Sequence, residues 1–556
     1  MEAVLVVFLI LASGLIAVRA LPSSVAERLD ATAILSGPAA PWVVGVLTTL
    51  LCGYVWGHLH PTAVVHDEAS YLLQARIFAQ GAFAMPARPL PEFFEQFHTY
   101  VTPSFASKYP PGHALLMAPG VWFGMPSLMP LLLDGVTGAL IFLLAHRIMN
   151  PWVGIISWLV WITPRATFTH LASYYSQSSS GAIWLLGWWA LLSWRDSRDR
   201  RWLFALAACV GWLAITRPLT ALAYSMPVGI VVLVLAARRR AWRDVTWATV
   251  IGAVTLLLIP YANLRTTGDW RVMPYSEYSK IYFPFDAPGF GLDTTPPRRA
   301  LPADMVQFGQ EFRPVHVKYT PDRLGGVLLR RFVRVSLDLW GGPRAVLFVA
   351  ALAAIPAIGA EVGFALASTL ALFVFYLSFA HDQNWTLYYS EVMPVLAFLS
   401  ASGLWRLLTR GDKNRSTATF SDAKRGWDAR PAAVAAVLVV LSLGVAVRDW
   451  RAFHRDRIAL QSFQRNFGEA VAKLPEARTI VFIRYAPWHI LHFSLIANDP
   501  DLESSHAWLV YDRGADNESL RRLAPSRTAY LFDEQRQVLI RQPTLDSVQE
   551  RGITAR

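Results

Sequence analysis

Charged residues and cysteines are scarce in this chain of 556 residues. Asp, Glu, Lys and Arg together make up 16% of it, whereas a soluble protein carries about 25%. The two cysteines, Cys52 and Cys209, both lie inside apolar stretches, which excludes a disulfide framework and a cysteine-based zinc site. Metal-ligand spacings such as HExxH are absent, and the lack of an internal repeat argues against an inverted-repeat transporter.

Hydrophobic residues, in contrast, make up 54% of the sequence and fall into long blocks. A helix of about 20 residues crosses a hydrocarbon core of about 30 Å. We therefore predict an all-α polytopic membrane protein with about 12 transmembrane helices. The predicted spans lie near 1–19, 41–60, 127–146, 151–170, 176–194, 202–216, 217–237, 244–264, 344–360, 363–380, 387–408 and 431–448.

The charged loops between these spans predict the topology. The formal charge is +12, but the basic residues cluster in short loops, which indicates topology signals and not nucleic-acid binding. Lys/Arg-rich loops are expected in the cytoplasm, and those at 195–201, 238–243 and 406–430 all fall on one side when the spans are counted alternately. The predicted domains are a transmembrane domain at 1–448, with periplasmic loops 61–126 and 265–343, and a soluble periplasmic domain at 449–556.

Strand patterns are found after residue 450, where the composition becomes that of a soluble protein. The segments 479–485, 507–512 and 528–533 are typical of strands, and 517–524 is typical of a helix between the last two. This part of the chain has no glycine-rich phosphate loop. We predict a small α/β domain that covers or recognises a ligand and does not catalyse.

Asp67 and Glu68 follow a predicted span directly, where charge near lipid is costly and indicates function. The apolar residues that come next, beginning with Tyr71 and Leu72, follow helical spacing. Asp67 and Glu68 lie four residues before them and extend the same stripe, so both acids are predicted to point toward protein or membrane. The alternative is that Asp67 is an N-cap whose carboxylate accepts backbone N–H groups.

Two cations are predicted near the same external surface. Lys108 precedes a Pro-Pro pair at the start of segment 112–124, which is too short to span and is predicted to be an interfacial or re-entrant helix. Helix N-termini bind anions, and the alternative is a lysine that snorkels at the membrane surface. Arg217 lies on a very short external turn, against the positive-inside trend, which favours anion binding over a topological role.

A late predicted span brings further polar residues to its outer end. The stretch HDQNWTLYYSEVMPVLAFL (381–399) includes Tyr389 and Glu391. Glu391 lies about one turn into the helix, where an acid needs a partner or a function, and the alternative is a charge pair with an external arginine. Cations that hold a leaving phosphate, together with a carboxylate that takes a proton from a hydroxyl, suit chemistry on a lipid phosphate.

In combination these motifs resemble the membrane glycosyltransferases of the GT-C superfamily, in particular the family-39-like branch that includes protein O-mannosyltransferases and lipid A aminoarabinose transferases. The pair Asp67-Glu68 followed by Tyr71 is similar to the acidic motif of the first external loop. KYPPGHALL (108–116) is similar to a Lys-Pro-Pro element, and YYSEVMPVLAFL (388–399) to a late Arg-Tyr-x-x-x-x-Pro element that here lacks its arginine. The resemblance covers about 41–408, and the tail from 481 onward is similar to that of uncharacterised bacterial members.

The resemblance implies a GT-C-like fold and inverting transfer of one sugar from a polyprenyl-phosphate donor, on the periplasmic face of a bacterial inner membrane. It implies that Asp67 is the catalytic base and that Glu68 supports it or contacts the acceptor. Lys108 and Arg217 are implied to bind the polyprenyl phosphate. Further residues implied to line the site are His66, Tyr71, Tyr389 and Glu391. No cofactor is identified; a divalent cation stays open, and so does the acceptor, which is a lipid, a glycan or a protein.

Two other classes of function remain open at this point. A transporter or flippase of a lipid-linked or anionic solute would also use external cations and acids in the membrane. It predicts charged residues near the bilayer midplane on several helices, and most predicted spans have none. A noncatalytic scaffold with a periplasmic recruiting tail is the other class, and it leaves the crowded acids at 67 and 68 unexplained.

Overall fold

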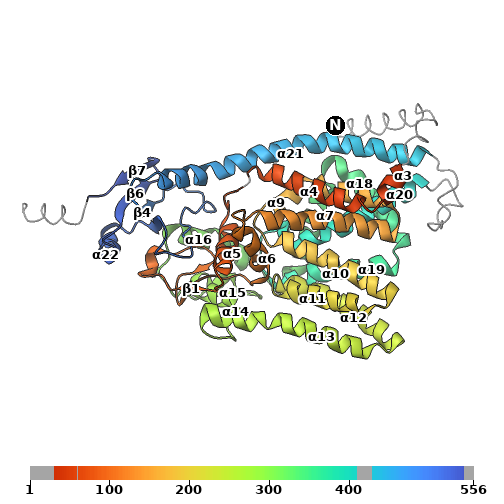
Figure 1. Cartoon of the computed structure of the whole chain (residues 1–556), viewed down its shortest axis with the longest axis horizontal. Helices are drawn as coiled ribbons and strands as arrows, with labels where there is room; N and C mark the ends of the chain where they lie inside the picture. Colours follow the sequence, from red (N-terminus) through yellow and green to blue (C-terminus); the bar gives the residue numbers. More distant parts are fainter. Residues whose placement is uncertain (1–30, 59, 410–428, 544–556) are drawn as a thin grey trace, which may run out of the picture.

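The computed structural model describes residues 31–58, 60–409 and 429–543, and Figure 1 shows the whole chain. The predicted span at 1–19 and most of the basic loop at 406–430 lie outside the described residues. Within the described residues, a helix lies at the position of each remaining predicted span.

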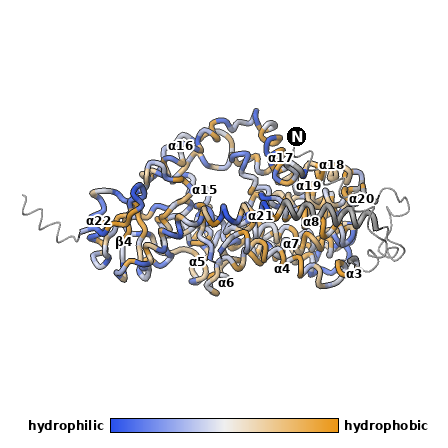
Figure 2. The backbone as a smooth tube through the Cα atoms, turned by 90° about the horizontal axis from the view of Figure 1, so that it is seen from above, coloured by the Kyte–Doolittle hydropathy of each residue, from blue (hydrophilic) through white to orange (hydrophobic). Residues whose placement is uncertain are grey.

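Helices stacked side by side along the long axis form the larger part of the molecule (Figure 1). Hydrophobic residues predominate in this bundle, whereas hydrophilic residues are frequent around α16 and α22 (Figure 2). The helices of the bundle are α4 (Ala40–Trp56), α7 (Leu128–Ile148), α8 (Pro151–Ile162), α10 (Gln177–Ser197), α11 (Arg200–Ala214), α12 (Pro218–Arg239), α13 (Trp242–Leu256), α14 (Leu258–Thr267), α18 (Ala345–Ala354), α19 (Ala360–Phe375) and α20 (Met393–Thr409).

Four helices among the described residues are long and apolar enough to cross a membrane, or five if the bent pair Pro321–Trp340 and Ala345–Ala354 forms one span. Two further apolar helices, Ala40–Trp56 and Pro151–Ile162, are shorter. The chain is therefore a multi-pass membrane protein by the length and composition of its helices, but the predicted number of about 12 spans is not confirmed. Many of the predicted spans are helices of fewer residues than the sequence pattern indicated.

Small residues allow α4 and α7 to approach closely. A Cβ added at Gly138 of α7 would lie 2.2 Å from Thr48 Oγ1 of α4, and one added at Gly135 would lie 2.2 Å from Thr49 Oγ1. Helices in membranes associate through such small-residue contacts, because lipid gives no hydrophobic driving force between them. This contact fixes α4 against the other helices of the bundle, and the chain continues from α4 to the helix at His66–Ala79.

The part outside the bundle, called external from here on for that reason alone, lies at one end of the bundle (Figure 1). Helix α6 has 11 residues and follows Pro110 and Pro111, in agreement with the short segment predicted there. The strands form an antiparallel sheet in the order β1-β3-β2. The elements are α5 (His66–Ala79), β1 (Met85–Pro86), β2 (Thr99–Tyr100), β3 (Ser104–Ser107), α6 (Gly112–Trp122), α9 (Arg165–His170), α15 (Pro274–Tyr282), α16 (Ala303–Val317) and α17 (Leu324–Trp340).

The C-terminal part forms a small sheet domain at the end of one long helix. Helix α21 (Ala429–Ala472) runs along the bundle and passes the predicted domain boundary at residue 448 without a break (Figure 1). Strands β4 (Thr479–Arg484), β5 (Ala507–Tyr511) and β6 (Thr528–Asp533), with α22 (Asn517–Leu523), agree with the predicted elements. The strand β7 (Val538–Arg541) was not predicted, and it completes a sheet of order β5-β4-β6-β7 in which only β6 and β7 are antiparallel.

The topology predicts opposite locations for two reporter fusions that flank the first part of α21. A reporter fused after Ala472, at the end of α21, should report the periplasm, whereas one placed within 411–428 should report the cytoplasm. An alkaline-phosphatase and fluorescent-protein pair at each position measures this. Identical signals from both positions would contradict a membrane crossing between them.

Candidate functional site

A cavity of about 1100 Å³ lies where the bundle meets the external helices. Five of the predicted site residues line it: His66, Asp67, Tyr71, Lys108 and Arg217. Glu68, Tyr389 and Glu391 do not line it. Other lining residues include His98, Tyr109, Arg165, His170, Ser176, Tyr275, Asp286, Phe312, Asp338, Trp385, Tyr388 and His492.

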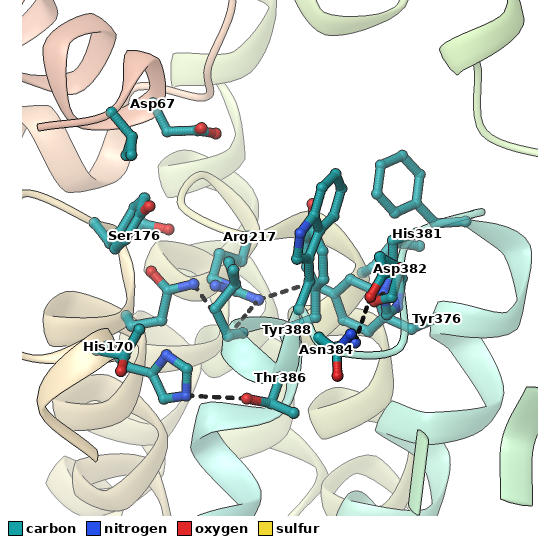
Figure 3. A pocket seen from close by; sticks show the side chains of 18 of the residues that line it. Asp67, His170, Ser176, Arg217, Tyr376, His381, Asp382, Asn384, Thr386 and Tyr388 are labelled. Carbon is teal, nitrogen blue, oxygen red and sulfur yellow. Dashed lines mark hydrogen bonds between the residues drawn. The ribbon is translucent and has the colours of Figure 1, made fainter. Parts of the chain in front are cut away.

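Asp67 points into this cavity from the first turn of α5 (Figure 3). Its side chain is 40% exposed, and its Oδ1 accepts a hydrogen bond from the Tyr109 hydroxyl. His98 Nε2 lies 3.7 Å from Asp67 Oδ2. The N-cap position belongs to the extended residue Val65, so the alternative of Asp67 as the N-cap is wrong. Asp67 is thus a carboxylate that is open to the cavity and is not used to start the helix.

Glu68, the next residue, is turned away from the cavity and is 1% exposed. Its Oε2 accepts the backbone N–H groups of Val64 at 2.8 Å and Val65 at 3.3 Å, which is the acidic half of a capping box. Its Oε1 accepts Tyr174 N at 3.2 Å and Arg457 Nη2 at 3.2 Å. Glu68 therefore ties the start of α5 to the 171–175 loop and to α21.

Removal of the Glu68 carboxylate is expected to destabilise the protein. Glu68→Ala leaves the mostly buried Arg457 without its acid, and the loss of one partner of a buried pair costs about 3–5 kcal/mol. Thermal unfolding in detergent measures this. The matched control is Asp67→Ala, which removes a carboxylate that is 40% exposed and should cost only about 1 kcal/mol. Equal losses in the two variants would contradict the structural role of Glu68.

Lys108 brings a positive charge to the cavity wall. It is 3% exposed, and its Nζ lies over the rings of Tyr275, Tyr278 and Tyr109 at 4.4, 5.0 and 5.4 Å from the centroids. Burial lowers the pKa of Lys108 from its ordinary value, although the charges of Asp286 and Asp67 oppose this. In the described part of the chain no carboxylate lies within 4.0 Å of its Nζ. An anion in the cavity would therefore meet a buried cation that has no described carboxylate in direct contact.

Arg217 stands at the start of α12 and is 7% exposed. Its Nη2 donates to the Tyr376 hydroxyl at 3.1 Å, and its Nε lies 3.6 Å from Glu391 Oε1. Glu391 is 1% exposed and also accepts from the Ser180 hydroxyl at 2.5 Å. The alternative of a charge pair between Glu391 and an arginine is therefore confirmed. Glu391 itself does not line the cavity, but its partner Arg217 does.

The remaining predicted residues occupy the walls. His66 donates from Nε2 to Leu491 O at 2.6 Å, and burial lowers its pKa to about 3, so it is neutral. Tyr71 stacks on Tyr109 with centroids 4.3 Å apart. Tyr389 is buried behind the wall, where its hydroxyl lies 3.1 Å from His381 Nε2, and its neighbour Tyr388 faces the cavity instead.

Several lining residues were not predicted from the sequence. Tyr109 stands between Lys108 and the Pro-Pro pair, and its place in that motif could have indicated it. His98 and His492 come from segments without a recognisable pattern, and the fold alone brings them together. His492 comes from the C-terminal domain, so this domain contributes to the cavity wall.

The described residues contain no group of three or more His, Cys, Asp or Glu side chains placed to hold a metal ion. The cations and acids of the cavity are instead spread over its walls. Arg165 pairs with Asp456 at 2.5 Å, and Arg334 lies 3.6 Å from Asp338. Figure 3 shows Asp67 on one side of the open space and Arg217 with Tyr388 on the other.

Comparisons with known proteins give a result for the fold. No protein-family model matches the chain, and no curated protein matches its sequence. The crystal structure of ArnT from Cupriavidus metallidurans in the apo state is similar, with a TM-score of 0.52, 15% identity and coverage of 92% of this chain and 91% of that one. The same protein bound to undecaprenyl phosphate gives a TM-score of 0.49 at 15% identity, with coverage of 90% and 94%. An oligosaccharyltransferase from Archaeoglobus fulgidus gives 0.41 at 11% identity, with coverage of 81% and 63%. Along most of its length the chain therefore has the fold of ArnT, and the resemblance drawn from its motifs is confirmed at the level of the fold.

Proposed function

We propose that the protein is a membrane glycosyltransferase that moves a sugar from a polyprenyl-phosphate donor to an acceptor hydroxyl at the periplasmic face, with Asp67 as the base. The observation that carries the proposal is a carboxylate open to a cavity of about 1100 Å³ whose wall also holds the buried Lys108, which pairs with no carboxylate of the described residues. A base and a cation facing one space are what transfer from a lipid phosphate needs.

The residues have separate tasks in this reaction. Asp67 takes the proton of the acceptor hydroxyl while the oxygen attacks the anomeric carbon of the donor. The bond from that carbon to the phosphate oxygen breaks, the sugar inverts, and the electron pair leaves with the polyprenyl phosphate. Lys108 and Arg217 stabilise the negative charge of this leaving group. Glu68 supports Asp67 by fixing the first turn of α5, and Glu391 holds Arg217 in place.

The shared fold supports this donor class. ArnT of Cupriavidus metallidurans, whose apo structure has the same fold, has also been solved with undecaprenyl phosphate bound. That ligand is a polyprenyl phosphate and is the leaving group proposed here.

The distribution of charge in the spans favours transfer over transport. A transporter of anionic solutes would place charged residues near the midplane of several helices. Of the four candidate spans, α7 alone has an acidic or basic residue more than three positions from its ends, namely Asp134. One acid on one helix does not form a path across the membrane.

A deletion strain tests the proposal. Mass spectrometry of its lipid-linked sugars and envelope glycans should show one polyprenyl-phosphate sugar accumulating and one envelope sugar missing. Complementation with the parent gene should restore both, and complementation with the Asp67→Asn gene should not. Unchanged glycans in the deletion strain would contradict the proposed function.

A further inference from the structure

Tyr109 is held in place by both its backbone and its ring. Its backbone N–H donates to the Ser107 hydroxyl at 3.2 Å, and its carbonyl accepts from Gln74 Nε2 of α5 at 2.8 Å. Its ring stacks on Tyr71, also on α5, with centroids 4.3 Å apart and planes 18° apart. The backbone and the ring together determine where the hydroxyl points, and it points at Asp67 Oδ1.

The two oxygens of Asp67 consequently have different surroundings. Oδ1 accepts the Tyr109 hydroxyl, whereas Oδ2 accepts no hydrogen bond from the described residues, and its near neighbour His98 Nε2 stays at 3.7 Å. Because the side chain is 40% exposed to the cavity, Oδ2 is the oxygen that a substrate hydroxyl can reach. A base with one fixed and one free oxygen has a defined direction of proton transfer.

We propose that Tyr109 is the positioning residue of the catalytic base: its hydroxyl fixes Oδ1 of Asp67 and leaves Oδ2 to take the proton of the acceptor. This inference rests on the proposed role of Asp67. Burial, reinforced by the charge of Asp67, raises the pKa of Tyr109 well above its ordinary value, so the hydroxyl stays protonated and remains a donor.

Other ionisable groups face Asp67 from the elements packed around it. His98 lies beside Oδ2, and the charge of Asp67 acts to raise the pKa of Lys108. The charge of Asp67 also acts to raise the pKa of further residues, namely Tyr71, Tyr175, Tyr275, Tyr388 and His492. Tyr109 differs from all of them because it alone, among the described residues, donates a side-chain hydrogen bond to the carboxylate.

The test uses Tyr109→Phe, which removes the donor and keeps the ring that stacks on Tyr71. A hydrophobic carbodiimide reacts with protonated carboxyl groups, so peptide mass spectrometry across a pH series reports when Asp67 is protonated. Without the donor the charged form is less favoured, and the pH of half-labelling should rise by about one unit. In turnover, the kcat of Tyr109→Phe should fall about 10-fold or more, while the KM for the donor stays near the parental value.

Tyr71→Phe is the matched control, because it deletes a hydroxyl from the other ring of the same stacked pair. That hydroxyl lies 3.3 Å from Ser176 Oγ and does not contact Asp67, so the half-labelling pH should not move. An unmoved half-labelling pH in Tyr109→Phe, or a parental kcat despite a moved one, would overturn the inference. The labelling needs no turnover, so failure of the parent to use a polyprenyl-phosphate sugar would refute the proposed function while the labelling still decides the role of Tyr109.

Discussion

Asp67→Asn is expected to express and melt like the parent while its turnover falls about 10²–10⁴-fold. The amide keeps the shape of the side chain, and its oxygen can still accept the Tyr109 hydroxyl. Val65, and not Asp67, is the N-cap of α5, so the change removes no cap. What it removes is the group that takes the proton. Initial rates of sugar transfer at saturating donor measure the loss.

A second acid of the same wall gives the control for this variant. Asp382 also lines the cavity, and its Oδ1 accepts the backbone N–H of Asn384 at 2.8 Å. Asp382→Asn removes an equal charge from the cavity. We expect turnover to fall less than about 10-fold, because Asp382 is not the group that takes the proton of the acceptor. Near-parental turnover of Asp67→Asn would show that Asp67 is not the base and that another acid takes the proton. Equal losses of turnover in both variants would indicate an effect of the cavity charge.

Lys108→Ala is expected to weaken use of the donor about 10- to 150-fold, through the KM of the donor. The loss of a hydrogen bond to a charged group costs about 1.5–3 kcal/mol, which converts to this range of affinity. Lys108 pairs with no described carboxylate, so its removal does not leave a described buried acid without its cation. The variant is therefore not expected to lose stability for that reason. Titration of the donor at fixed enzyme measures the effect.

The controls for Lys108→Ala separate binding from general charge effects. Lys280→Ala removes an exposed lysine of α15 that lies 3.7 Å from Glu277, and its donor titration should match that of the parent. Arg217→Ala is a less direct test, because it also leaves the buried Glu391 without its cation and is expected to lower stability. A parental donor titration in Lys108→Ala would remove this lysine from the phosphate site.

The elements that could be predicted from the sequence are those set by local patterns. Blocks of about 20 apolar residues give the helices of the bundle, and short β-branched and aromatic runs give β4, β5 and β6. Asp67 and Lys108 could also be predicted, because each lies in a motif next to an apolar helix. The number of membrane crossings could not, since several apolar blocks form helices shorter than a span.

The roles of neighbouring residues could not be separated from the sequence. Asp67 and Glu68 are adjacent, but successive residues on a helix point about 100° apart, so one faces the cavity and the other faces the protein. The partner that makes Glu68 structural is Arg457 of α21, which is distant in the chain. Tyr388 and Tyr389 also differ in position: Tyr388 lines the cavity, whereas Tyr389, whose dihedrals are non-helical, is buried behind the wall. Contacts between distant segments decide these roles.

The central claim, that Asp67 is the base of a transfer from a polyprenyl phosphate, is tested most directly by the fate of the donor. Purified protein in liposomes is given a polyprenyl-phosphate sugar, with a membrane extract of the deletion strain as the source of acceptor, and the polyprenyl phosphate released is measured by mass spectrometry. We predict release by the parent, and release at least about 100-fold slower by Asp67→Asn. No release by the parent, or equal release by the two proteins, would contradict the account.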